Sequence, residues 1–196
     1  MRDIRRLGVF CGSSPGADPA YVRAARQLGV CLAREGITLV YGGGNVGLMG
    51  ALADAALSGG GQVIGVIPHG LVVKEAAHRG VTELRVVDSM HDRKAEMARL
   101  SDAFVALPGG LGTMEEFFEI ITWLQLGIHH KPCALLHVAG YYDKLIEFLD
   151  FSDRQELVRP AHREAVLVSA DADRLLEALR SHPLAPTEKW ISLSES

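Results

Sequence analysis

The residue types best suited to chemistry lie between Ala103 and Leu126. A short apolar run, Ala103 to Leu107, predicts a buried parallel strand, and Pro108 and three glycines within four positions follow it. From Thr113 onwards, apolar residues recur at helical spacing. The segment therefore predicts a strand, a glycine loop and a helix. Such a loop brings free N–H groups and the positive end of a helix dipole close to a ligand, which favours a phosphate.

Two adjacent carboxylates, Glu115 and Glu116, are predicted in the first turn of that helix, with Glu119 one turn further on. Two interpretations stay open. Thr113 to Glu116 has the form T-x-x-E, which is typical of a capping box. A carboxylate beside an anion-binding loop also suits a site that holds a phosphate and attacks a group attached to it. Spacing alone supports both equally.

Two further glycine loops follow predicted strands. Ser13 follows the strand Leu7 to Cys11 and is a candidate phosphate contact, although Gly-Ser-Ser-Pro-Gly is also an ordinary turn. Gly43 lies in G-G-G-N-V-G-L-M-G, between a strand over 37–41 and a helix over 47–58. That loop indicates either nucleotide-phosphate binding or tight helix–strand packing. It fits a dinucleotide fingerprint poorly, because Pro68 stands near where an acidic residue would meet a ribose.

Strands and helices alternate along the chain. Further strands are predicted at 62–67, 84–87, 132–138 and 165–168, and further helices at 19–35, 90–100, 141–151 and 171–180. Alternation of this kind predicts an α/β fold, a Rossmann-like three-layer sandwich with a doubly wound, mostly parallel sheet. The three glycine loops should then share one edge, beyond the carboxyl ends of the strands. We expect a single domain over residues 1–196, with a loose tail after about 183.

Composition narrows the function classes. The chain has 196 residues, 48% of them hydrophobic, and a net charge of −4, with no long basic run, so no nucleic-acid partner is expected. No signal peptide is predicted and no apolar run approaches the ~20 residues that span a bilayer, so no membrane partner is expected. Three scattered cysteines indicate a reduced cytoplasmic protein, with Cys11 a buried filler rather than a reactive thiol. The eight histidines show no ligand spacing, so no metal is expected.

Four motifs together carry a family resemblance. They are P-G-G-L-G-T-M-E-E at 108–116, the glycine loop at 42–50, S-M-H-D-R-K at 89–94 and T-W-L-Q-L-G at 122–127. This set closely resembles the Lonely Guy family of cytokinin riboside 5′-monophosphate phosphoribohydrolases, long mislabelled as lysine decarboxylases. The resemblance covers roughly residues 7–150. It implies a Rossmann-like fold, a dimer, and cleavage of the base–ribose bond in an N6-modified AMP to give free base and ribose 5-phosphate.

The resemblance implies that Arg93 and Glu116 are the catalytic pair. The expected substrate and phosphate contacts, from the loops and the resemblance together, are Ser13, Gly43, Glu75, Lys94, Gly109, Gly110, Leu111, Gly112, Thr113, Met114, Glu115 and Thr122. Breaking an N-glycosidic bond builds positive charge on the ribose, which a carboxylate can stabilise while it activates water. Arg93 is too basic to act as an acid at neutral pH, so it should orient Glu116 and the ribose phosphate. Leu111 stands where plant members often carry Tyr, which leaves open the preferred base and any activity on plain AMP.

Two other functions stay open. A non-catalytic nucleotide or cofactor carrier would keep the glycine loops without needing Arg93 and Glu116. A decarboxylase would need a pyridoxal cofactor and a Schiff-base lysine, and no such signature occurs, so no cofactor is expected. The helix after the 108–112 loop is apolar on more than one side, which predicts a homodimer across it, with Glu75 or a neighbour reaching the site from that interface.

Overall fold

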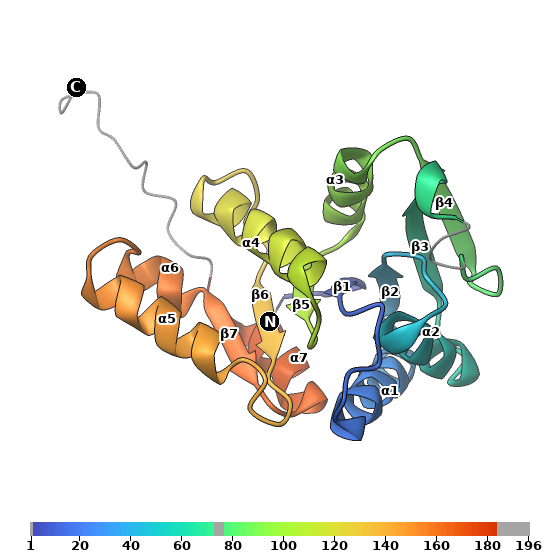
Figure 1. Ribbon diagram of the computed structural model, residues 1–196, viewed down its shortest axis with the longest axis horizontal. Coiled ribbons are helices and arrows are strands. Elements are labelled where there is room, and N and C mark those ends of the chain that lie inside the picture. The colour runs from blue at the N-terminus through green and yellow to red at the C-terminus, as the bar shows by residue number, and fades with distance from the viewer. Residues whose placement is uncertain (1, 73–76, 184–196) are drawn as a thin grey trace.

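The computed structural model describes residues 2–72 and 77–183. In this part of the chain seven strands form one sheet in the order β4-β3-β2-β1-β5-β6-β7, with helices on both faces (Figure 1). The strands are β1 (Arg6–Phe10), β2 (Thr38–Tyr41), β3 (Val63–Pro68), β4 (Glu83–Val87), β5 (Ala103–Ala106), β6 (Cys133–Leu136) and β7 (Val166–Ser169). The helices are α1 (Pro19–Arg34), α2 (Gly47–Ser58), the 3₁₀ turn η1 (His69–Leu71), α3 (Met90–Leu100), α4 (Leu111–Gln125), α5 (Asp143–Arg154), α6 (Pro160–Glu164) and α7 (Ala172–Ser181).

Every neighbouring pair of strands in the sheet is parallel, so the predicted doubly wound α/β fold is confirmed. Strand β1 lies in the middle, between β2 and β5, with Val9 opposite Tyr41 and Phe10 opposite Ala106. Because the three strands run in the same direction, the loops that follow them leave from one edge of the sheet. The expectation that the Gly12, Gly43 and Gly110 loops share an edge is therefore confirmed.

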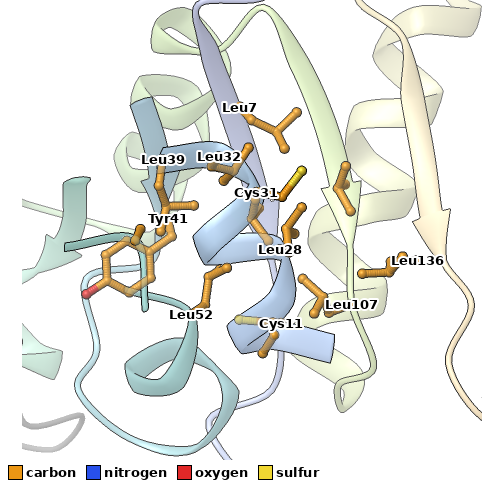
Figure 2. Packing of buried hydrophobic residues seen from close by; sticks show 14 of the residues in the cluster. Leu7, Cys11, Leu28, Cys31, Leu32, Leu39, Tyr41, Leu52, Leu107 and Leu136 are labelled. Carbon is orange, nitrogen blue, oxygen red and sulfur yellow. The ribbon is translucent and has the colours of Figure 1, made fainter. Parts of the chain in front are cut away.

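Two apolar layers hold the helices to the sheet. One layer lies under α1, α2 and α7 and includes Leu28, Leu52 and Leu175. Figure 2 shows part of it, with Leu28 of α1 and Leu52 of α2 among strand residues that include Leu7, Leu39 and Tyr41. The other layer lies under α3, α4 and α5. Helix α1 begins as predicted, since the Asp18 side chain accepts a hydrogen bond from the backbone N–H of Ala20 at 2.8 Å.

Two of the helix starts differ from prediction in ways that matter for the site. Helix α4 begins at Leu111 rather than Thr113, with Gly110 as the N-cap residue in an extended conformation. Thr113 is therefore the third helical residue and not a cap, so the capping-box interpretation is wrong. Glu115 and Glu116 consequently lie in the second turn, not the first. Helix α5 begins at Asp143 instead of residue 141, which leaves two tyrosines in the preceding loop.

The described helices include none that is long and apolar enough to cross a membrane. The predicted loose tail after residue 183 lies outside the described residues.

Candidate active site

A cleft of about 310 Å³ opens at the edge of the sheet where the loops after β1 and β5 meet α3 and the first turn of α4. Its lining has three kinds of residue. The polar side chains are those of Ser13, Arg93, Thr113 and Glu116, and the glycines that expose backbone are Gly12, Gly110 and Gly112. The apolar wall is formed by Cys11, Met49, Leu71, Met90 and Leu111. The cleft therefore unites the sequence-predicted catalytic pair with part of the predicted phosphate loop.

The first turn of α4 forms an open backbone cradle. The N–H groups of its first residues have no acceptor within their own helix, and the helix dipole places partial positive charge there. A Cβ atom added at Gly110 or at Gly112 would meet nothing within 4 Å, so both glycines face open space. Thr113 is buried, and its hydroxyl occupies the space beside Gly109, where a Cβ would lie 2.1 Å from Oγ1. This arrangement suits an anion of the size of a phosphate.

Arg93 and Glu116 form a buried ion pair on the wall of the cleft. Arg93 is 6% exposed and Glu116 is 7% exposed, and Nη2 of Arg93 lies 3.7 Å from Oε1 of Glu116. Helix α3 presents Arg93 from its second turn. Its start is fixed by Ser89, whose hydroxyl accepts a hydrogen bond from the N–H of Asp92 at 3.1 Å. A buried charge pair costs desolvation energy, so its location in a cleft is typical of a functional site.

The second glycine loop makes room for this arginine. A Cβ on Gly42 would lie 1.9 Å from Nη2 of Arg93, so any side chain at residue 42 would displace the guanidinium. Gly43 is buried, and its carbonyl accepts a hydrogen bond from the N–H of His78 at 2.9 Å. Among the residues found to line the cleft, Gly43 does not occur. The structure thus favours the packing interpretation of this loop over direct phosphate contact.

The other acidic residues of α4, Glu115 and Glu119, form ion pairs with Lys94 rather than with Arg93. Lys94 is 6% exposed and forms ion pairs with Glu115 and, at 3.1 Å, with Glu119. Burial opposes the ammonium charge, but the hydrogen bonds to these two carboxylates outweigh it and raise the pKa of Lys94. Because consecutive helical residues point about 100° apart, Glu115 faces Lys94 while Glu116 faces the cleft. Of the adjacent pair, Glu116 is therefore the one that lines the cleft.

Cys11 lies in the cleft wall but is not a candidate nucleophile. Burial and the nearby Glu116 carboxylate raise the pKa of its thiol well above the usual range, and the lowering effect of Arg93 is smaller. The thiolate is the reactive form, so this cysteine is held unreactive. The predicted role of Cys11 as a buried filler agrees with its 8% exposure.

The other sequence-predicted contacts are distributed unevenly. Ser13 and Leu111 line the cleft, and Leu111 is 90% exposed. Met114 packs against the core beneath α4. Thr122 lies far along α4, where its hydroxyl donates to the carbonyl of Phe118 at 2.7 Å. Glu75 lies outside the described residues.

Sequence analysis missed the apolar wall of the cleft, which is made by Met49, Leu71 and Met90. They lie on three different segments of the chain, so no local pattern signals that they would meet. Among the described residues, no group of three or more His, Cys, Asp or Glu side chains is placed to hold a metal ion.

Comparison with known proteins finds similar sequences over most of the chain. The family model described as "Possible lysine decarboxylase" matches residues 49–179. The cytokinin riboside 5′-monophosphate phosphoribohydrolase of Rhodococcoides fascians is 51% identical over 178 residues, covering 90% of this chain and 90% of that protein. The enzyme of the same name LOG1 from Arabidopsis thaliana is 48% identical over 192 residues, covering 95% of this chain and 90% of its own.

Solved structures give a second set of similarities. The molybdenum cofactor binding protein from Rippkaea orientalis superposes with a TM-score of 0.67 at 26% identity, covering 92% of this chain and 98% of that one. The Moco carrier protein from Chlamydomonas reinhardtii gives a TM-score of 0.68 at 24% identity, covering 90% of this chain and 95% of that one, and supports the fold alone. The extent and identity of the sequence matches show that this chain belongs to the Lonely Guy family, whose model is described as "Possible lysine decarboxylase" and whose named members are cytokinin riboside 5′-monophosphate phosphoribohydrolases.

Proposed function

We propose that this chain hydrolyses the N-glycosidic bond of N6-modified adenosine 5′-monophosphates, or of AMP itself, to free base and ribose 5-phosphate. The observation that carries the proposal is the buried Arg93–Glu116 pair in the same cleft as the open first turn of α4. Named relatives about 50% identical carry this activity in their names. A pure phosphate-binding protein would have no need of a buried carboxylate beside its anion site.

The geometry suggests how the substrate lies. The 5′-phosphate occupies the cradle at Gly110, Gly112 and Thr113, where N–H groups meet its charge. Glu116 is three residues after Thr113, so its Cα is about 4.5 Å further along the helix axis. That offset is comparable to the reach from a 5′-phosphate to the anomeric carbon of the same ribose. The apolar wall of the cleft then suits the base and an apolar N6 substituent.

In the reaction, the bond between the anomeric carbon and the base nitrogen breaks, and its electron pair leaves with the base. A water oxygen forms the new bond to the anomeric carbon, and one proton of that water passes to the Glu116 carboxylate and then to solvent. The departing base nitrogen takes up a proton from solvent, which balances the proton that the water lost. Glu116 also stabilises the positive charge that builds on the ribose. Arg93 holds that carboxylate in place and contributes to binding the ribose phosphate.

The test is incubation of the purified protein with AMP and with isopentenyl-AMP, followed by chromatography for free base and ribose 5-phosphate. Glu116→Gln is the matched control, because it keeps the side-chain shape without the charge. Release of base by the wild type and not by Glu116→Gln supports the proposal. Tight nucleotide binding by the wild type with no release of base would instead support a carrier function. The similarity to a molybdenum cofactor binding protein is consistent with that alternative. A pyridoxal absorbance band would indicate a decarboxylase.

We also propose that the protein is a homodimer. Large apolar side chains are exposed on α4, on α5 and in the loops after them, all on one face of the sheet; they are Phe118, Leu126, Ile128, Phe148, Phe151 and Leu157. A cluster of such side chains is typical of a protein interface. Phe148→Glu should shift sedimentation at micromolar concentration from dimer to monomer. Val30→Glu, which alters an exposed residue of α1 on the opposite face, should leave the dimer intact.

A cytoplasmic location is the final part of this proposal. The three cysteines, Cys11, Cys31 and Cys133, are all buried and free. Free thiols persist in a reducing compartment, and this composition fits the cytoplasm better than an oxidising one. Fractionation of cells that express the protein at its native level would test the proposal.

A further inference from the structure

Two consecutive tyrosines, which the sequence analysis placed in a helix, lie instead in the loop between β6 and α5. The Tyr141 hydroxyl donates a hydrogen bond to the carbonyl of Gly109. The Tyr142 hydroxyl donates to the carbonyl of Leu107 at 2.5 Å. Ala139 and Gly140, with φ of 49° and 73°, both adopt left-handed backbone conformations that turn the chain just before this pair. A loop with a strained non-glycine residue thus brings both hydroxyls to the segment that leads into the phosphate cradle.

The hydrogen bond from Tyr141 fixes the direction of one donor of the cradle. In a trans peptide the C=O and N–H groups point in opposite directions. The carbonyl of Gly109 points toward Tyr141, so the N–H of Gly110 in the same peptide points away from it. Tyr141 and Gly109 line an adjoining pocket of about 290 Å³, which shares Gly12, Ser13 and Gly110 with the cleft. The N–H of Gly110 therefore points away from Tyr141, at a residue that also lines the cleft.

The hydrogen bond from Tyr142 cannot do the same. The peptide that follows Leu107 ends in Pro108, which has no N–H. Holding the carbonyl of Leu107 therefore orients no donor. Tyr142 is 1% exposed and belongs to the core under α5, whereas Tyr141 is 41% exposed. The two neighbouring hydroxyls thus make similar hydrogen bonds with different consequences. The bond from Tyr141 orients a donor of the cradle, and the bond from Tyr142 contributes to the stability of the fold.

We propose that Tyr141 is a positioning residue for the 5′-phosphate, because its hydroxyl holds the Gly109–Gly110 peptide in the orientation that presents the Gly110 N–H to the anion. The inference rests on the proposed function for the identity of the anion. Tyr141 lines the adjoining pocket and not the cleft, whereas Arg93 and Glu116 line the cleft and not that pocket. Its effect is therefore on binding of the phosphate group, not on the bond that breaks.

The test compares Tyr141→Phe with Tyr142→Phe. Each variant removes one hydroxyl and keeps its ring, including the edge-on ring contacts that Tyr141 makes with Tyr21 and Tyr142. Calorimetric titration with ribose 5-phosphate should show that Tyr141→Phe weakens binding by about tenfold, the scale of one hydrogen bond to a charged group. Tyr142→Phe should lower the melting temperature and leave this dissociation constant unchanged. Adenosine, which has no phosphate, should bind equally well to all three proteins.

In steady-state assays with a nucleotide 5′-monophosphate, Tyr141→Phe should raise KM while kcat stays near the wild-type value. Unchanged binding of ribose 5-phosphate by Tyr141→Phe, or equal weakening by both variants, would overturn the inference, as would a wild type that does not bind ribose 5-phosphate. The titration does not depend on turnover. A wild-type protein that binds ribose 5-phosphate but releases no base would therefore refute the proposed function and leave this comparison decisive.

Discussion

Replacing Gly112 with alanine should make the protein more stable and less active. Gly112 is the second residue of α4, and a Cβ added there meets no protein atom within 4 Å. Glycine is about 1 kcal/mol less favourable than alanine in a helix interior, and somewhat less so in a first turn. The substitution should therefore raise the free energy of unfolding by about 0.5–1 kcal/mol. For a chain of this length that corresponds to a rise of roughly 1–4 °C in melting temperature.

The same methyl group should fill part of the phosphate cradle. Gly112 lines the cleft with Gly110 and Thr113. A Cβ at Gly112 would enter the open space that we assign to the 5′-phosphate. The anion would have to move away from the N–H groups of the first turn. A loss of one such charge-assisted contact is worth roughly 1.5–3 kcal/mol, so KM should rise by at least about tenfold.

Two measurements decide the outcome: thermal unfolding of the free protein, and initial rates with isopentenyl-AMP. Ser58→Ala, at the exposed end of α2, is the control, because it improves helix propensity at a residue that does not line the cleft. It should leave KM unchanged. A Gly112→Ala protein with higher stability and wild-type KM would show that the phosphate does not bind at this turn. A loss of stability would show that the space at residue 112 is not open.

Three further predictions concern Glu116, the space around Arg93 and the buried His129. Glu116→Gln should lower kcat by about 10²-fold or more, roughly 2.7 kcal/mol, with little change in KM, and near-normal release of base would remove this residue from the chemistry. Gly42→Ala should push the Arg93 guanidinium out of place and reduce kcat/KM as Arg93→Ala does, while circular dichroism shows an intact fold. Burial lowers the pKa of His129 from 6.5 to about 4. As pH falls, this histidine is therefore protonated in the unfolded chain at a higher pH than in the folded protein. The stability that the neutral histidine contributes above pH 6.5 is lost as pH falls toward 4. Denaturant unfolding at pH 7 and pH 5 should show this loss in the wild type, and His129→Gln should show a smaller one.

Much of the fold was accessible from the sequence. The alternation of apolar runs with helical spacing predicted the parallel sheet, and the glycines after three of those runs predicted loops on one edge. Parallel strands and right-handed crossovers leave few other arrangements. The first residue of a helix was harder to predict from the sequence, as α4 shows. The glycines at 110 and 112 argued against a helix there, but an N-cap residue is not helical and a first turn tolerates glycine.

The sequence by itself determined the α/β fold, the glycine loop at the end of β5 and the presence of carboxylates beside it, since these depend on short-range patterns. Spacing alone did not distinguish Glu115 from Glu116, because neighbours in sequence carry the same spacing, and only the family resemblance pointed to Glu116. Only the tertiary structure decided that Lys94 engages Glu115, that Glu116 faces Arg93, and that Gly42 leaves space for that arginine. These contacts join residues on different elements, between 21 and 51 positions apart. The packing of α3 and α4 over the sheet sets which side chains meet, and no local pattern encodes that geometry.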